Sequence, residues 1–339
     1  MPENTAAWIL EAKADLQILS SPYTAPADDE IVIQNHAIAI QPFDANVRGN
    51  AYIPVPYPFI LGNGTAGIVE EVGSGITRFK KGDRVVSDTP TYQLKEAKYG
   101  AWQKYVVTKD ATTARIPDGT TFEDAAAIPF ALLTAVSALS LKLGMARAGE
   151  GAGAAPGIKG KALIWGASGS VGGYAVQYAS SAGYEVIATA SPRKFEYVRE
   201  LGATQVIDYK DSLAVSKLRD VGPYDFIMCA SGDAPGANAI SQILQPTGGK
   251  FASTRPKSDA MDLASNVELV YDVYSMTTQK PENEEFSRWY YGYLSTALAG
   301  GVTPTPLEKR GGGLARIQEA CEDVLGGKSA KKLVLNPQE

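Results

Sequence analysis

Lys161-Ala-Leu-Ile-Trp-Gly-Ala-Ser-Gly-Ser-Val-Gly172 is the stretch that decides the fold of this chain. Its apolar first half predicts a buried strand, its three glycines predict a tight turn, and the Ala-rich residues beyond it predict a helix. Glycines let backbone N–H groups at the helix N-terminus approach a pyrophosphate, which the helix dipole attracts. The pattern predicts a dinucleotide site formed by Gly166, Ser168, Gly169, Ser170, Val171 and Gly172.

A second strand follows the helix and completes a β-α-β unit. Residues 174–183 carry apolar or small side chains at helical spacing, and residues 185–191 form another apolar run. A unit of about 30 residues is what a parallel crossover needs. Glycines also mark ordinary strand-to-helix turns, but the completed unit favours the dinucleotide over a bare turn.

The residues after the second strand indicate which dinucleotide binds. Units that bind NAD usually place Asp or Glu there, on the ribose 2′-hydroxyl. This chain has Ser191-Pro192-Arg193-Lys194 instead. Hydroxyl and cationic donors bind a 2′-phosphate that a carboxylate would repel, so NADPH is favoured over NADH. The alternative is that Arg193 and Lys194 only begin a solvated helix.

Composition narrows the class of protein. The chain has 339 residues, 45% hydrophobic and 20% charged, which predicts two ordinary globular domains. A net charge of −5 offers no basic surface for nucleic acid or an anionic membrane. Cys229 and Cys321 stand far apart, so neither a disulfide framework nor a Cys-rich metal site is indicated. Without a signal-like or membrane-spanning apolar run, we expect a cytoplasmic protein.

The local sequence pattern differs between the first part of the chain and the rest, which predicts two parts. Residues 1–125 carry short alternating segments between Pro, Gly and Asp, which is typical of an all-β unit. A helix is expected from Thr121, and residues 150–160 are expected to be an inserted surface loop. Further strands are predicted at 205–208, 224–229 and 249–253, separated by helical stretches. That alternation predicts an α/β fold with a doubly wound parallel sheet.

Four separated motifs in this order resemble the medium-chain dehydrogenase/reductase superfamily. They are Pro58–Gly73, Phe79–Val85, Ile128-Pro129 with Leu133-Thr134-Ala135, and the glycine turn. Residues 187–192 and 201–209 are similar to its zinc-free fungal branch, which includes trans-acting enoyl reductases of polyketide synthesis and toxin-cluster reductases. The resemblance implies a GroES-like β domain (residues 1–125 and 279–339), a Rossmann NADP(H)-binding domain (residues 126–278), and a cleft between them.

The resemblance also implies particular site residues. Ser191, Lys194 and Tyr209 would contact the 2′-phosphate, and Thr134 would lie near the nicotinamide. The segment 44–52 would face the cleft. Tyr52 is the nearest match to a tyrosine that enoyl-thioester reductases use as a donor, with simple packing of its ring as the alternative. Asn46 replaces a lysine common in the fungal branch and is the other catalytic candidate in this segment.

No metal site is predicted. A catalytic zinc needs three ligands of Cys, His or carboxylate type, and a structural zinc needs a Cys cluster. The single histidine, His36, lies beside an apolar run and is expected to be structural. Zinc-using relatives carry Gly-His-Glu where this chain has Gly62-Asn63-Gly64.

Without zinc, hydride transfer needs an acceptor that is already activated, such as an α,β-unsaturated thioester or enone. We therefore expect NADPH-dependent reduction of a small-molecule or carrier-bound enoyl substrate in fungal secondary metabolism. Three alternatives stay open: a quinone reductase, a non-redox cyclase or isomerase, and a non-catalytic dinucleotide-binding partner. Residues 266–273 are expected to form an edge strand that either pairs across a homodimer or is covered.

Overall fold

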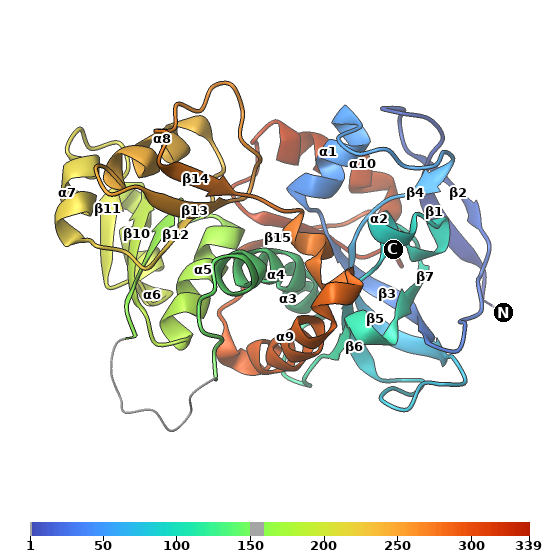
Figure 1. Cartoon of the computed structure of the whole chain (residues 1–339). Helices are drawn as coiled ribbons and strands as arrows, with labels where there is room; N and C mark the ends of the chain where they lie inside the picture. The colour runs from blue at the N-terminus through green and yellow to red at the C-terminus, as the bar shows by residue number, and fades with distance from the viewer. Residues whose placement is uncertain (1, 150–158) are drawn as a thin grey trace. The chain divides into compact units, whose positions relative to one another are not determined.

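The computed structural model describes residues 2–149 and 159–339 (Figure 1). The expected loop at 150–160 falls almost wholly outside the described residues. Contacts divide the chain into two compact units. Unit 1 is Met1–Phe130 with Thr278–Glu339, and unit 2 is Ala131–Thr277.

Unit 2 contains a six-stranded parallel sheet in the order β11-β10-β9-β12-β13-β14. The strands are β9 (Lys161–Trp165), β10 (Glu185–Ala190), β11 (Gln205–Asp208), β12 (Phe226–Cys229), β13 (Gly249–Ser253) and β14 (Val267–Val270). From β9 the chain builds the sheet first to one side and then to the other, so the order reverses between β9 and β12. In such sheets ligands bind at the carboxyl ends of the strands beside this reversal.

The strands of unit 2 are apolar because both faces of the sheet are covered. The helices that follow them are α5 (Ser170–Ser181), α6 (Phe195–Glu200), α7 (Ala214–Val221) and α8 (Ala234–Ile243). Leu163, Ile187 and Ile227 are buried from adjacent strands and pack with Leu218 and Ile240 of the helices. The predicted doubly wound parallel sheet is confirmed.

Unit 1 is built on two β-sheets. The larger has the order β15-β16-β3-β5-β6-β8, with β7 also paired to β3, and the smaller has the order β2-β1-β4. Their strands are β1 (Asn4–Ile9), β2 (Gln17–Ser21), β3 (Glu30–Ala39), β4 (Phe59–Ile60), β5 (Gly64–Val72), β6 (Arg84–Asp88), β7 (Tyr105–Lys109), β8 (Thr113–Arg115), β15 (Leu307–Arg310) and β16 (Lys332–Leu335).

The largely antiparallel sheet of unit 1 closes over its own core. Ile31 and Ile33 of β3 pack with Val69 of β5, Val85 of β6 and Val106 of β7. Alternate residues of these strands therefore share one buried face, as period-two patterning requires. This sheet confirms the predicted all-β unit and the GroES-like architecture that the family resemblance implies.

Helices complete unit 1 and lead into unit 2. They are α1 (Pro42–Asn50), α2 (Thr91–Leu94), α3 (Phe122–Ala127), α4 (Pro129–Val136), α9 (Glu284–Thr296) and α10 (Ile317–Leu325). Thr121 caps α3 by accepting the Asp124 backbone N–H. Residues 122–142 form a helical stretch long and apolar enough to cross a membrane, but most of it is buried, as in a core helix.

Candidate active site

The predicted dinucleotide turn joins β9 to α5 and is hydrogen-bonded to β10. Gly166 has φ 83°, a conformation that suits glycine, and its N–H donates to Thr189 Oγ1 at 3.0 Å. The Ala167 N–H donates to the Thr189 carbonyl at 2.9 Å. Thr189 is fully buried, so one side chain and its backbone hold the turn against the neighbouring strand. Thr189 was not predicted from the sequence, in which its one signal is that it is a polar residue inside an apolar strand.

Two glycines of the turn have different surroundings. A Cβ on Gly172 would lie 2.3 Å from the Gly166 carbonyl oxygen and 2.8 Å from Ala167 Cα, so the helix approaches the turn as closely as backbones allow. Gly169 is the N-cap of α5, and its nearest neighbour would be 3.9 Å away. It is exposed and has no side chain to cap the first turn of the helix. This open, glycine-capped helix N-terminus fits a pyrophosphate.

The three residues expected at the 2′-phosphate follow two adjacent strands. Ala190 of β10 pairs with Asp208 of β11, so Ser191 and Tyr209 each come directly after paired residues at one edge of the sheet. Lys194 ends the short 3₁₀ turn Pro192–Lys194 and Tyr209 is 42% exposed. A hydroxyl, an ammonium and a phenol are therefore the groups available at these strand ends.

Two neighbours of Tyr209 were missed by the sequence analysis. The Lys210 Nζ lies 5.8 Å from the Tyr209 ring centroid and adds a second cation. Asp208 is an acid at the same edge, and its Oδ1 accepts the Lys210 backbone N–H at 3.0 Å. Thr134, the expected nicotinamide neighbour, lies on α4 and is buried.

Of the two catalytic candidates of unit 1, Asn46 lies in the middle of α1 and Tyr52 lies just beyond its end. The Asn46 amide donates to the Pro42 carbonyl at 2.7 Å and its Oδ1 accepts from Asn50 Nδ2 at 2.8 Å, so the side chain runs along the helix. Ala51, with φ 51°, ends the helix. Tyr52 follows with 48% of its surface exposed, its ring 5.9 Å from that of Phe43. The structure thus places Asn46 and Tyr52 on one segment, with Asn46 already hydrogen-bonded within it.

A buried polar cluster lies behind α1 and was not found from the sequence. Asp44 accepts a 2.7 Å hydrogen bond from the Tyr92 hydroxyl. Burial raises the pKa of Asp44 to about 6, less than burial alone would, because Tyr92 and the charge of Lys332 favour the anion. Burial also lowers the pKa of Lys332 to about 8. Asp88, the last residue of β6, belongs to the same cluster, and burial and Asp44 raise its pKa to about 8.

His36 and Asn63 have partners other than a metal ion. The half-buried His36 stacks on Phe122 with 5.1 Å between ring centroids, and burial lowers its pKa. Asn63 donates to the Thr89 carbonyl at 3.1 Å. Within residues 2–149 and 159–339, no three His, Cys, Asp or Glu side chains gather as a metal site would require.

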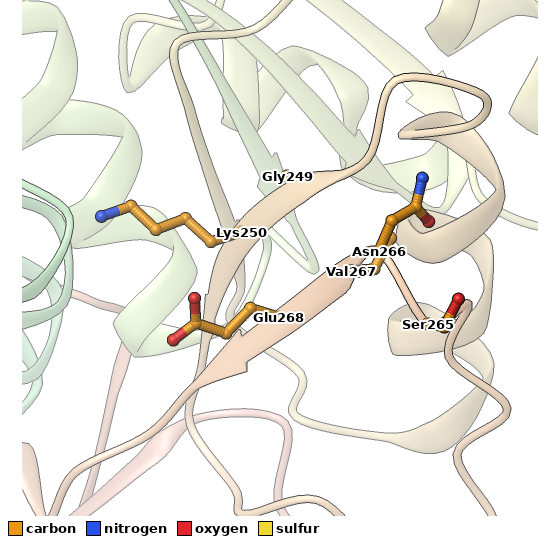
Figure 2. Close-up of a pocket in the computed structure, with 6 residues that line it drawn as sticks. All are labelled: Gly249, Lys250, Ser265, Asn266, Val267 and Glu268. Carbon is orange, nitrogen blue, oxygen red and sulfur yellow. The ribbon is translucent and has the colours of Figure 1, made fainter.

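A shallow hollow lies at the opposite edge of the unit 2 sheet. Figure 2 shows its lining residues on β13, β14 and the segment before β14, with Lys250 and Glu268 extending from paired positions of the two strands. β14 is the last strand in the sheet order, as expected for an edge strand. The hollow is far along the sheet from the strand ends that carry Ser191 and Tyr209.

Two protein families match this chain. Residues 27–118 match the alcohol dehydrogenase GroES-like domain, and residues 170–254 match the zinc-binding dehydrogenase family. The zinc-binding alcohol dehydrogenase domain-containing protein cipB of Emericella nidulans is 34% identical, with 98% of each chain covered. The trans-enoyl reductase himH of Aspergillus japonicus is 30% identical over 98% of this chain and 97% of its own.

Solved structures share the fold along almost the whole chain. A putative zinc-dependent alcohol dehydrogenase from Rhizobium etli has a TM-score of 0.80 at 25% identity, covering 98% of both chains. The Escherichia coli quinone oxidoreductase in complex with NADPH has a TM-score of 0.75 at 23% identity, covering 99% of this chain and 100% of that one. With a relative 34% identical along 98% of its length, a GroES-like unit and a Rossmann-type NAD(P)-binding unit, the chain belongs to the medium-chain dehydrogenase/reductase superfamily.

Proposed function

We propose that this protein is an NADPH-dependent, zinc-independent reductase of an activated C=C bond in an enoyl thioester or enone. The observation that carries the proposal is the set of groups after β10 and β11, where Ser191, Lys194 and Tyr209 offer a hydroxyl, a cation and a phenol. Such groups suit a 2′-phosphate. The relatives named trans-enoyl reductases support the choice of substrate class.

The glycine turn, from Gly166 to Gly172, would hold the pyrophosphate, and Thr134 would lie near the nicotinamide. NADPH bound there supplies the hydride. When that hydride adds to the β-carbon, the substrate oxygen would gain negative charge, which a hydroxyl aimed at it would stabilise. A proton from solvent, taken up at the α-carbon, would then complete the saturated product. We assign Tyr52 as the donor to the substrate oxygen, and Asn46 would support it by accepting the hydrogen bond from Asn50 at the end of α1. Because conjugation already activates the alkene, the scheme needs no metal ion.

Coenzyme choice tests the proposal directly. We expect purified protein to oxidise NADPH, but not NADH, when enoyl thioesters or enones are supplied, as followed by the near-ultraviolet absorbance of the reduced coenzyme. Lys194→Ala should weaken NADPH binding about tenfold or more, because it removes a charge-assisted contact, and leave NADH binding unchanged. The matched control is Lys250→Ala, an exposed lysine at the other edge of the same sheet (Figure 2).

The same assay separates the alternatives. Turnover with quinones alone would identify a quinone reductase instead, and product formed without any nicotinamide would identify a non-redox cyclase or isomerase. Tight NADPH binding with no turnover would identify a non-catalytic partner. Equal affinity for NADH and NADPH would overturn the proposal itself. In this scheme residues 1–125 and 279–339 form the catalytic domain, residues 126–278 form the coenzyme domain, and the enzyme is cytoplasmic.

The donor role of Tyr52 has its own test. Tyr52→Phe should lower kcat about 100-fold with little change in the NADPH dissociation constant, because the hydroxyl acts on charge that develops during the reaction. Tyr293→Phe removes a hydroxyl from α9 and is the control. An unchanged kcat in Tyr52→Phe would mean that the ring only packs against Phe43.

A further inference from the structure

Two buried carboxyl groups of unit 1 differ in the partners they have. Asp44 and Asp88 are each 1% exposed. Asp44 accepts the hydrogen bond from Tyr92 and is attracted by Lys332. Neither carboxylate oxygen of Asp88 has a hydrogen-bond partner among the described residues. An ionised Asp88 would therefore be a buried, unpaired charge, which is among the costliest arrangements in a protein.

Among the residues that the structure describes, the groups that act on the Asp88 carboxyl include no cation. Its partner on β5 is Gly64, and α3 faces this end of β5 with small residues, Ala125 to Ala127. The Asp44 carboxyl of α1 and the Tyr291 phenol of α9 also act on this position. Burial and a negative charge on Asp88 both raise the pKa of Tyr291.

The charged and titratable groups of β16, β8 and α10 interact with residues other than Asp88. Lys332 of β16 donates to Gln41 Oε1 at 2.6 Å. Arg115 of β8 pairs with Asp83 at 2.7 Å. Cys321 of α10 is influenced by Asp44, but burial raises the pKa of its thiol, so it stays neutral. Asp44 is thus the ionised group that acts on the Asp88 carboxyl.

Two carboxyl groups that influence each other in a dry interior do not both ionise at neutral pH. One proton must be kept by the pair. Asp44 has a donor and a cation to stabilise its anion, whereas Asp88 has neither, so the proton belongs on Asp88. The direction of both pKa shifts agrees, with Asp88 raised further than Asp44.

We propose that Asp88 is a neutral, protonated carboxylic acid, and that it is a positioning residue whose proton sets the upper pH limit of catalysis. The second half rests on the proposed reductase function. Asp44 lies on the helix that carries Asn46 and ends before Tyr52, and Phe43 packs against both Tyr92 and Tyr52 at 5.3 and 5.9 Å. When Asp88 gives its proton to solvent, a second anion forms beside Asp44 and opposes the negative charge that develops on the substrate oxygen.

Infrared spectroscopy tests the proton without any activity. The difference spectrum between the wild type and Asp88→Asn at neutral pH should contain a carboxylic-acid carbonyl band that shifts in D₂O. That band should disappear as the pH rises through about 8. In Asp44→Asn it should disappear at lower pH, because the neighbouring negative charge is gone. A difference spectrum without this band at neutral pH overturns the proposal.

A cation is the rival occupant of the cluster. Titration calorimetry with Mg²⁺, Ca²⁺ and K⁺ should detect no binding that Asp88→Asn removes. Stoichiometric binding abolished by that substitution would show that a metal ion, rather than a proton, neutralises Asp88, and would also overturn the proposal.

The pH dependence of kcat tests the link to catalysis. With an enoyl thioester and saturating NADPH, wild-type kcat should fall about tenfold per pH unit above the pKa of Asp88. The profile of Asp88→Asn should stay level there, and the exposed control Asp118→Asn should follow the wild type. The same fall in Asp88→Asn would refute the positioning role. If the infrared band is present but the protein reduces no alkene, Asp88 is protonated as proposed and the proposed function is refuted instead.

Discussion

Replacing Gly172 with valine is expected to abolish NADPH binding and to destabilise unit 2. The new Cβ would be forced against the Gly166 carbonyl oxygen and Ala167 Cα, which are backbone atoms of the turn itself. No side-chain rotation can relieve that contact, so the turn must open or the helix must move away. Overpacking of this kind costs about 1–3 kcal/mol, and displacement of the turn removes the anion-binding geometry as well.

Fluorescence titration with NADPH and thermal unfolding measure the two effects separately. Gly169→Ala is the informative control, since its Cβ meets nothing closer than 3.9 Å and should leave the melting temperature of the free protein unchanged. Gly292→Ala, in an open position on α9, should raise stability by about 0.5–1 kcal/mol. A Gly172→Val protein that binds NADPH with wild-type affinity would contradict the assignment of this turn.

Glu30→Gln should lower the free energy of unfolding by about 3 kcal/mol at pH 7. Glu30 is 1% exposed at the start of β3, and Lys98 and Lys109 each approach its Oε1 at 3.1 Å. Tyr99 also donates to it. Burial alone would raise the pKa of Glu30, but Tyr99, the Ala27 backbone N–H and the two lysines hold the pKa at about 2. The amide keeps the shape of the side chain and removes the charge that binds both lysines.

The pH dependence of this loss has a definite sign. The pKa of Glu30 is lower in the folded protein than its ordinary value of 4.5, so its stabilisation is complete above that value and is lost as pH falls towards 2. Urea unfolding of the wild type and Glu30→Gln should therefore differ less than half as much at about pH 3 as at pH 7. Glu71→Gln, which removes the charge of an exposed partner of Tyr23, should cost under about 1 kcal/mol. Equal stability of the wild type and Glu30→Gln at pH 7 would contradict this account.

Local pattern was enough to predict the unit 2 sheet and its glycine turn. Strand, glycines and helix follow one another within residues 161–181, so the information is contiguous. Thr189 escaped prediction because its role depends on β10 pairing beside β9. The Asp44 and Asp88 pair escaped for a stronger reason: one lies on α1 and the other ends β6, and only the β5–β6 register brings the second into the cluster.

Asn46 illustrates a different limit of sequence reasoning. Its residue type and position in the sequence predict a polar group that faces the substrate. In the structure its amide bonds to Pro42 and Asn50 along α1. Asparagine side chains compete for nearby backbone and side-chain partners, and spacing alone does not decide which partner is chosen. Asp208 is a similar case, because its carboxylate accepts a hydrogen bond from the Lys210 backbone N–H in the turn that follows β11.

The placement of β16 has a consequence for how the protein is made on the ribosome. β16 pairs with Ala39 and Ile38 of β3, whose sequence is translated almost three hundred residues earlier. Unit 2 is continuous in sequence, so all of its strands emerge before β16 is synthesised. Until β16 is synthesised, the nascent chain therefore carries an incomplete β-sheet, in which Ile38 and Ala39 of β3 lack the strand that pairs with them, whereas residues 30–34 can already pair with β7. Such an unpaired strand segment is open to pairing with another chain until then.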